Sequence, residues 1–388
     1  MSNKTMENNN MTSILITGGA GFIGSNLALK LINLGYQVTV LDNLSPQIHG
    51  ISPEQTSPLY NLIKGKVNFI KGSVTEKEAW QRALKEQDVV IHLAAETGTG
   101  QSMYEIEKYS SVNVQGTALL LDILTNEKHA VSKVLVASSR AIYGEGRYQC
   151  STHGVVYPLA RGDGDLAKGD FECKCPVCGN EITLLPTSED SLIHPTSVYG
   201  ITKQIQEQLV MMVCPTINIA PVALRYQNVY GAGQSLSNPY TGILSIFSTQ
   251  IKNGHDLNIF EDGLESRDFV YIDDVVNGTI RAMESKCANG QIYNVGTGVA
   301  TNVKTVANTL IEKYDSPVKC FISGNYRSGD IRHNIADISK ITASLDFIPQ
   351  YNFVEGIQKF VDWVNLQDIQ TDKYDESISE MKKKGLFK

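Results

Sequence analysis

Residues Thr17–Gly24 read TGGAGFIG, and this octapeptide decides the fold. It closes an apolar run, Ser13–Thr17, that is typical of a buried strand, and it opens a helical pattern. Gly18 permits the tight turn, Gly21 lets the backbone approach a pyrophosphate, and Gly24 allows the helix to pack closely on the strand. The free N–H groups at the start of such a helix attract phosphate. The stretch therefore predicts a dinucleotide site on a strand–turn–helix unit.

The alternation of short apolar runs and helical stretches continues to about residue 143. Strands that alternate with helices form right-handed crossovers and a parallel sheet. We therefore expect an α/β fold, a doubly wound Rossmann-type parallel sheet with helices on both faces. The further runs expected to be strands are Gln37–Leu41, Val67–Ile70, Asp88–Leu93, Lys133–Ser138 and Pro221–Arg225, and the clearest helical patterns cover Phe22–Leu34, Val112–Leu124 and Ser197–Val213.

A chain of 388 residues, 42% hydrophobic and 19% charged, is long enough for two or three packed units. Residues 1–12 are polar and are expected to form a flexible tail. We expect the dinucleotide-binding domain over 13–230, with a Cys-rich insertion at 145–195 where the periodicity stops. Most of 231–388, where the segments are shorter and mixed, is expected to form a smaller C-terminal substrate-binding domain.

The charge balance excludes some classes of partner. Lys and Arg number 34 and Asp and Glu 41, which gives a net charge of −7, and no basic run stands out. Such a chain is a poor candidate for binding nucleic acid or an anionic membrane surface. No apolar stretch approaches the roughly 20 residues that span a bilayer, and the N-terminus lacks the apolar segment of a secretory signal. We expect a cytoplasmic protein.

Asp42 indicates which dinucleotide binds. It stands at the end of the second expected strand, 24 residues after Gly18. A carboxylate there accepts hydrogen bonds from ribose hydroxyls and repels a 2′-phosphate. No Lys or Arg lies between Gly35 and Lys64 to pair with such a phosphate. NAD is favoured over NADP, and the alternative is that Asp42 only caps a turn with Asn43.

A tyrosine and a lysine begin the helical pattern after the insertion. Ser197–Lys203 reads SVYGITK, which places Tyr199 and Lys203 at i and i+4 on one helix face. A phenol titrates near pH 10, and a nearby ammonium, together with the positive nicotinamide of NAD⁺, favours the phenolate. Ser139 stands at the end of the fifth strand. The three side chains predict hydroxyl chemistry beside the dinucleotide.

With these motifs the chain resembles the extended short-chain dehydrogenase/reductase family of nucleotide-sugar epimerases and dehydratases, over nearly its whole length. The resemblance implies NAD as cofactor and a nucleoside-diphosphate sugar as substrate. It also implies that Ser139 binds the reacting sugar hydroxyl, Tyr199 is the acid/base and Lys203 orients the cofactor. Members pair through two central helices, so a homodimer through the helices of Asn113 and Tyr199 is expected.

The resemblance also assigns binding residues one by one. Gly72-Ser73-Val74 departs from the pattern, because many members have an Asp at Ser73 that meets the adenine amine, so the affinity for NAD is less predictable. The implied substrate contacts are Thr97, Ser139, Tyr199, Asn228, Arg267, Arg327 and Arg332. The implied cofactor contacts are Gly18, Gly21, Phe22, Ile23, Gly24, Asp42, Asn43, Ser73, Val74, Leu93, Ala94, Ala95, Asn113, Tyr199, Lys203 and Tyr226.

The residues after Ser139 bear on the reaction. Dehydratases of the family carry Asp-Glu there to eliminate water, whereas this chain has Arg140-Ala141, and neither residue is an acid/base at neutral pH. Ser139, Tyr199, Lys203 and NAD suffice for transient oxidation of a carbinol, rotation of the ketosugar and return of the hydride. The sequence therefore favours an epimerase.

Two stretches suggest the substrate by resemblance. Glu96–Tyr104 and Ser139–Gly146 resemble those of dTDP-L-rhamnose 4-epimerases, which form dTDP-6-deoxy-L-talose. A UDP-hexose 4-epimerase and a CDP-sugar 2-epimerase are alternatives, because the same machinery oxidises whichever carbinol is presented. An NAD-binding sensor without activity is the non-enzymatic alternative.

The insertion carries two pairs of metal-ligand residues. Cys150-x-x-His153 and Cys175-x-x-Cys178 are separated by 21 residues, a pattern that fits tetrahedral Zn²⁺. A closed four-ligand site is structural rather than catalytic. Cys173 is near enough to compete for a place, and the alternative is a loop with free thiols. We expect a structural zinc site.

Overall fold

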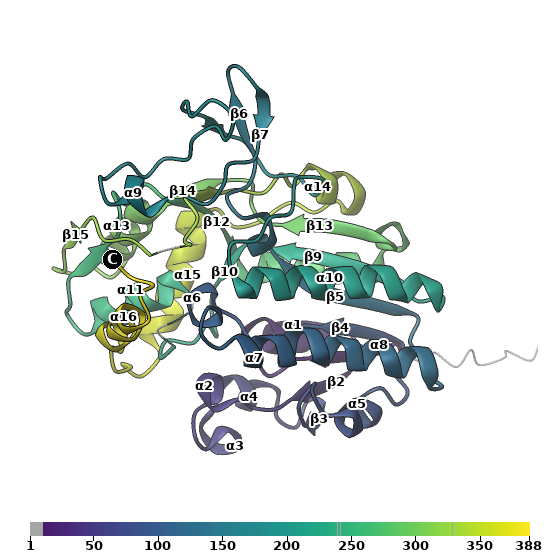
Figure 1. The fold of residues 1–388 in the computed structure, drawn as a ribbon. Helices are drawn as coiled ribbons and strands as arrows, with labels where there is room; N and C mark the ends of the chain where they lie inside the picture. Colours follow the sequence, from purple (N-terminus) through teal and green to yellow (C-terminus); the bar gives the residue numbers. More distant parts are fainter. Residues whose placement is uncertain (1–10, 239, 241, 328) are drawn as a thin grey trace, which may run out of the picture.

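A computed structural model describes residues 11–238, 240, 242–327 and 329–388. The tail expected at 1–12 lies almost wholly outside the described residues. Seven parallel strands form the central sheet in the order β13-β9-β5-β4-β1-β2-β3 (Figure 1). This is the strand order of a doubly wound dinucleotide-binding fold, extended by one strand at the β13 edge. The strands are β1 (Ser13–Thr17), β2 (Gln37–Asp42), β3 (Asn68–Lys71), β4 (Val89–His92), β5 (Lys133–Ser139), β9 (Ala220–Tyr226) and β13 (Gln291–Val295).

The sheet is buried on both faces because its side chains alternate. Ile14 and Ile16 of β1 face one apolar cluster and Leu15 faces the other, and all three are fully buried. Helices α1 (Phe22–Asn33) and α12 (Ile272–Glu284) cover the first face. The second face is covered by α5 (Lys77–Ala83), α8 (Gly116–Asn126) and α10 (Val198–Thr216), of which α8 and α10 lie side by side in Figure 1. The predicted fold class is confirmed.

Two elements differ from the sequence prediction. The pattern expected as one helix over Val112–Leu124 is a π-helical stretch, η1 (Ser110–Gln115), that continues into α8. The seventh strand, β13, was not predicted, and it belongs to the part of the chain beyond residue 230. It pairs in parallel with β9 from Gln291↔Val222 to Val295↔Tyr226. The C-terminal part therefore returns to the central sheet as well as building the smaller lobe.

The smaller lobe surrounds the carboxyl ends of the strands and contains two short sheets. β12 (Ser266–Tyr271) pairs with β10 (Asn228–Tyr230), β14 (Ala300–Asn302) and β16 (His333–Asn334), and β11 (Leu257–Ile259) pairs with β15 (Cys320–Ile322). Its helices are α11 (Ile243–Lys252), α13 (Val303–Lys313), α15 (Phe353–Asn365) and α16 (Tyr374–Lys383), whereas α14 (Ser339–Leu345) packs beside β13 at the edge of the central sheet. The remaining short helices are α2 (Pro46–His49), α3 (Pro53–Thr56), α4 (Pro58–Ile63), α6 (Thr99–Ser102), α7 (Ile106–Tyr109), η2 (Arg140–Tyr143) and η3 (Lys286–Ala288).

The Cys-rich insertion stands away from the sheet at the top of Figure 1. A small antiparallel sheet, β7-β6-β8, forms its core, from β6 (Tyr148–Cys150), β7 (Gly154–Val156) and β8 (Thr183–Leu184), and α9 (Asp163–Leu166) lies in the long loop between β7 and β8. The insertion leaves and rejoins the sheet domain at one place, because the His194 N–H donates to the Ile142 carbonyl at 3.0 Å.

Candidate active site

The glycine-rich turn between β1 and α1 leaves no room for larger residues. Gly18 has a φ of +65°, and a Cβ there would lie 2.9 Å from the backbone of Ala94. At Gly24 a Cβ would lie 2.4 Å from the Gly18 carbonyl oxygen. No side chain caps the amino end of α1, where Gly21 is the N-cap residue. Its first N–H groups are thus available to an anion.

One cavity of about 440 Å³ runs from this turn along the carboxyl ends of the strands. Four of its lining residues, Ser138, Gln227, Asn228 and Gln234, carry buried polar atoms with no hydrogen-bond partner among the described residues. Buried polar atoms in folded proteins are nearly always bonded, so these atoms indicate a polar ligand. Every predicted cofactor contact except Asn113 lines the cavity, as do the predicted substrate contacts Thr97, Ser139, Tyr199 and Asn228.

Asn113 has a different position from the one expected. It is fully buried and outside the cavity. Its Oδ1 accepts from the Glu96 N–H at 2.8 Å, and its Nδ2 donates to the Glu96 carbonyl at 3.1 Å and to Thr202 Oγ1 at 3.0 Å. The expectation that Asn113 binds the cofactor is wrong in this geometry, because the protein itself uses its amide. It ties the segment after β4 to α10.

Asp42 lies in the cavity wall at the end of β2. Its carboxylate accepts from the backbone N–H groups of Ala20 at 3.0 Å and Leu44 at 2.8 Å. Burial raises the pKa of Asp42, while these two hydrogen bonds and His49, 3.9 Å away, oppose the rise. The carboxylate is thereby fixed in orientation and presents acceptor capacity to the cavity. His49 and Gln47 also line this part, and no motif in the sequence pointed to either residue.

Lys203 is held in a buried hydrogen-bonded chain below the cavity. Its Nζ donates to Gln206 Oε1 at 2.7 Å, and Gln206 Nε2 donates to Thr117 Oγ1 at 2.8 Å. Thr117 also contacts His92 Nε2 at 3.0 Å. Burial lowers the pKa of Lys203 to about 7. Burial and, to a smaller extent, the Lys203 charge lower the pKa of His92 to about 3, so the imidazole is neutral.

Tyr199 and Ser139 face the same cavity from α10 and β5. The Tyr199 N–H donates to Ser102 Oγ at 3.0 Å, and the Tyr109 ring meets the Tyr199 ring edge-on with centroids 6.5 Å apart. Burial raises the pKa of Tyr199, and the Ser139 hydroxyl and the Arg140 charge lower it. We expected the Lys203 ammonium to favour the phenolate, but the neighbouring cation that does so here is Arg140.

Arg140 lines the cavity directly after Ser139. Within the part of the chain that the structure describes, its guanidinium donates no hydrogen bond to another residue. Burial and the charge of Arg267 lower the pKa of Arg140 to about 9. Sequence reasoning used this residue only to exclude water elimination. Its place beside Ser139 was the available signal that it belongs to the site.

The three arginines predicted to contact the substrate do not line the cavity. Arg267 donates to the carbonyls of Ser266, Ile331 and Arg332, and Arg327 pairs with Asp330 at 2.8 Å. Arg332 is fully buried and its guanidinium is occupied by the carboxylates of Glu172, Glu261 and Asp262 at 2.6–2.9 Å. The expectation that Arg332 binds substrate is therefore wrong, because its N–H groups are used within the protein.

The four predicted metal ligands lie together. The ligand atoms of Cys150, His153, Cys175 and Cys178 are all within 4.8 Å of one another. Cys150 Sγ is 3.6 Å from His153 Nδ1 and 3.8 Å from Cys178 Sγ, and Cys175 Sγ is 3.5 Å from His153 Nδ1. Tetrahedral Zn²⁺ with Zn–S near 2.3 Å and Zn–N near 2.0 Å requires ligand separations of about 3.5–3.8 Å. These three separations match such a site, the other pairs among the four ligands lie within 4.8 Å, and Cys173 is not part of the cluster.

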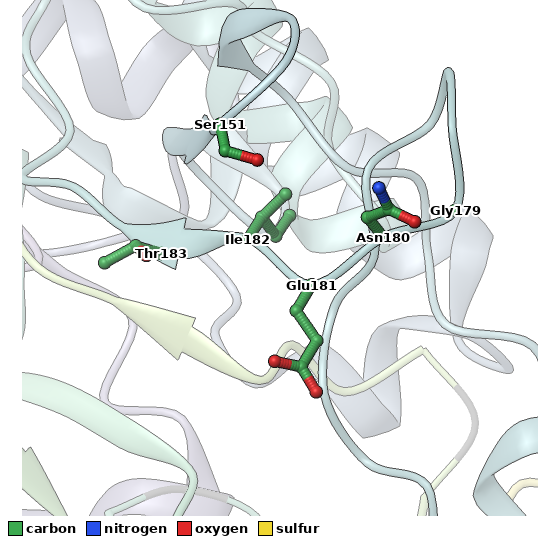
Figure 2. A pocket seen from close by; sticks show the side chains of 6 residues that line it. All are labelled: Ser151, Gly179, Asn180, Glu181, Ile182 and Thr183. Carbon is green, nitrogen blue, oxygen red and sulfur yellow. The ribbon is translucent and has the colours of Figure 1, made fainter.

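A second hollow, of about 680 Å³, lies on the outer side of the insertion and shares no residue with the cavity (Figure 2). It is lined by Ser151, Gly179, Asn180, Glu181, Ile182 and Thr183, most of them exposed. None of the predicted site residues is among them, so the chemistry belongs to the cavity at the strand ends. Among the described residues, no helix is both long and apolar enough to cross a bilayer.

Comparisons with known proteins agree with this geometry. A profile of the NAD dependent epimerase/dehydratase family matches residues 14–159 and 175–296. A dTDP-L-rhamnose 4-epimerase of Burkholderia thailandensis is 37% identical over 90% of this chain and 94% of its own. The UDP-glucose 4-epimerase of Thermotoga maritima, solved with UDP-glucose, superposes with a TM-score of 0.73 at 29% identity, covering 91% and 99% of the two chains. The UDP-glucuronic acid 4-epimerase of Bacillus cereus, solved with UDP-glucuronic acid and NAD, gives 0.72 at 26% identity, with 91% and 99% covered.

Proposed function

This chain belongs to the NAD dependent epimerase/dehydratase family, as the sequence predicted, and from this premise we propose that it is an NAD-dependent nucleotide-sugar 4-epimerase. One observation carries the proposal: Ser139, Tyr199 and Lys203 line one cavity, with Arg140 and Ala141 where a dehydratase would need carboxyl groups. Hydride transfer needs only the first three side chains, whereas water elimination needs an acid and a base that are not there.

Ser139, Tyr199 and Lys203 have different roles, which follow from their positions in the cavity. Ser139 holds the C4 hydroxyl, and Tyr199 takes its proton as the carbinol is oxidised and gives it back at the end. Lys203, fixed by Gln206 at 2.7 Å, orients the nicotinamide ribose. When bound, NAD⁺ would supply the hydride acceptor for C4, and the resulting NADH would supply the hydride for the opposite face of the sugar. Between the two steps the sugar must turn, so binding is concentrated on the nucleotide.

The cavity fits NAD. The turn at Gly18 and the uncapped start of α1 suit a pyrophosphate. Asp42 suits the adenosine ribose and opposes a 2′-phosphate. Ser73 lines the adenine end and can accept a hydrogen bond in place of the usual Asp. These residues and the other predicted cofactor contacts that line the cavity are our proposed NAD site.

We propose dTDP-L-rhamnose as the substrate and dTDP-6-deoxy-L-talose as the product. The relative that is 37% identical over nearly both full lengths, together with the loop Glu96–Tyr104, supports this choice. UDP-hexoses are the second candidate, supported by the likeness to UDP-glucose 4-epimerase.

The test is incubation with dTDP-L-rhamnose in D₂O, with the sugar protons followed by NMR and with UDP-glucose and UDP-galactose in parallel tubes. We expect a new C4 epimer with no deuterium on carbon and no accumulating NADH. Deuterium in the ring would mean enolisation and would overturn the mechanism. Turnover of a UDP-hexose alone would replace the substrate and keep the mechanism.

We further propose that Cys150, His153, Cys175 and Cys178 bind a structural zinc ion. Three of their ligand separations, of 3.5–3.8 Å, support it. Metal analysis of the purified protein should give about one zinc per chain, and Cys175→Ser should abolish it. Zinc-free wild-type protein in which the thiols of Cys150, Cys175 and Cys178 all react would overturn the assignment.

We propose a homodimer formed by α8 and α10. These helices lie side by side on the outside of the sheet, and α10 exposes Ile201 (46%) and Met212 (72%). Light scattering should give twice the mass of the chain, 42.6 kDa. Ile201→Glu should give the monomer, and an unchanged dimer in that variant would place the interface elsewhere.

A further inference from the structure

The Cys-rich insertion makes its most buried contacts with one short segment of the smaller lobe. Glu145 (1% exposed) and Arg161 (4%) lie at its inner edge. The Arg161 guanidinium donates to both oxygens of Glu261 at 2.8 Å and to the carbonyl of Asp330 at 2.9 Å. Glu145 accepts from the Arg332 N–H at 2.6 Å. Hydrogen bonds from Arg161 and to Glu145 therefore attach the segment 330–332 to the insertion.

That segment in turn places the arginines expected at the nucleotide. Arg267 donates to the carbonyls of Ile331 at 2.7 Å and Arg332 at 2.9 Å. Arg327 pairs with the Asp330 carboxylate at 2.8 Å, and the backbone carbonyl of the same Asp330 accepts from Arg161. If 330–332 moved outward, Arg267 would keep only its bond to the Ser266 carbonyl, and Arg327 would lose its carboxylate partner.

An apolar contact joins the same two parts. Leu166 and Phe171 of the insertion form a small buried cluster with Tyr326, the residue before Arg327. The Arg161 guanidinium also donates to the Phe171 carbonyl at 3.0 Å, which ties the ends of this loop together. The loop 157–174 thus carries both the buried cation and the apolar residues that contact the lobe.

The metal ligands flank this loop. Cys150 and His153 precede it and Cys175 and Cys178 follow it, so one ion would close the loop at both ends. Apart from the ligands, the small sheet holds these ends by three residue pairs between β6 and β7 and two between β6 and β8. A metal that joins two such ends contributes its binding free energy to the order of the loop.

We propose that the metal-closed insertion is a wall of the nucleotide subsite, in which Arg161 and Phe171 are positioning residues for Arg267 and Arg327. The inference rests on the proposed function and on the family resemblance, which implies substrate contacts at those arginines; we propose that they contact the nucleoside diphosphate, whose phosphate oxygens match the guanidinium fork. The metal then sets the affinity for the nucleotide half of the substrate, while the NAD site, whose lining includes neither Arg267 nor Arg327, is independent of it. Breaking a buried ion pair leaves an unpaired charge, so loss of Arg161 should release the segment.

The test measures binding without turnover. Calorimetric titration with dTDP, UDP and NAD is carried out on zinc-loaded wild type, on Cys175→Ser and on Arg161→Met. Both variants should bind the nucleoside diphosphate at least tenfold more weakly and NAD within twofold of wild type. Arg161→Met should keep its zinc. Lys168→Met, which removes an exposed cation of the same insertion, should behave as wild type.

The outcomes separate the inference from the proposed function. Wild type that binds neither dTDP nor UDP would overturn both. Wild type that binds one of them, with Arg161→Met or Cys175→Ser binding it equally well, would overturn only the role of the insertion. A parallel loss of NAD affinity in Arg161→Met would also overturn it, because the change would then be a general loss of structure.

Discussion

Replacing Lys203 by Met should stabilise this protein while abolishing its activity. The ammonium is 2% exposed and has one hydrogen-bond partner in the described structure, Gln206 at 2.7 Å. Burial lowers its pKa from an ordinary value near 10.5 to about 7. A difference of about 3.5 units corresponds to at most about 5 kcal/mol against the folded state, since one unit is about 1.4 kcal/mol.

The sign of the pH dependence follows from proton uptake. Between pH 7 and 10.5 the unfolded chain holds the Lys203 proton more tightly than the folded one, so the free energy of unfolding rises with pH in that window. Below pH 7 the full destabilisation from burying the Lys203 charge applies, and above pH 10.5 this destabilisation is absent. Methionine removes the penalty but leaves Gln206 Oε1 without its donor, which costs about 1–3 kcal/mol. The net gain expected at pH 7.5 is about 1–3 kcal/mol.

The assay is urea unfolding of nucleotide-free protein, followed by circular dichroism at several values between pH 7 and 10. The gain of Lys203→Met should shrink as the pH rises. Lys133→Met is a matched control, because Lys133 is also buried with a lowered pKa but donates to the carbonyls of Ala282, Met283 and Ser285. That variant should be less stable than wild type. A Lys203→Met protein that is destabilised at pH 7.5, or whose gain does not change with pH, would refute the reasoning.

Three further substitutions test the site. Tyr199→Phe should keep the fold and NAD binding and reduce kcat at least 100-fold by NMR assay, whereas an NAD sensor would lose little. Arg140→Met should raise the pH at the midpoint of the rising limb of the kcat/KM profile, because the Arg140 charge lowers the pKa of Tyr199. Arg140→Lys should restore the midpoint. An unmoved midpoint in Arg140→Met would assign Arg140 to binding alone. Gly18→Ala should cost about 1–3 kcal/mol in urea unfolding, because φ is +65° and the Cβ would press on the Ala94 backbone at 2.9 Å; unchanged stability would mean that the turn can relax.

The sheet could be predicted because its signals are local. The strand Ser13–Thr17 has the bounds that its apolar run predicts, and the glycine turn places α1 directly after it. The strand Gln291–Val295 was missed because QIYNV is short, has polar residues at Gln291 and Asn294 that interrupt its apolar run, and lies among other short elements. Its assignment depends on pairing with β9, about 70 residues earlier in the sequence, which no local pattern contains.

The site residues, like the strands, could be predicted where the signal is local in sequence and could not where it is distant. The spacing of Tyr199 and Lys203 was enough to predict that they share a helix face. The four metal ligands could be predicted from two short sequence motifs. Arg332 and Asn113 were misassigned because their partners are far away in sequence. Arg332 is occupied by Glu172 from the insertion, and Asn113 bonds Glu96 and Thr202, so neither has its hydrogen-bonding groups available to a ligand.

The hydrogen bond from the His194 N–H to the Ile142 carbonyl has a consequence for how such a molecule can change over time. The polypeptide departs and comes back at one point, so the outer part of the insertion can be exchanged there, provided that Thr187 and Glu189 keep their bonds to Asn294 and Arg225. Sites where the two ends of a segment adjoin are where natural chains accept whole modules. The scaffold can therefore diversify its sugar-nucleotide preference by grafting at this junction, leaving its redox machinery untouched.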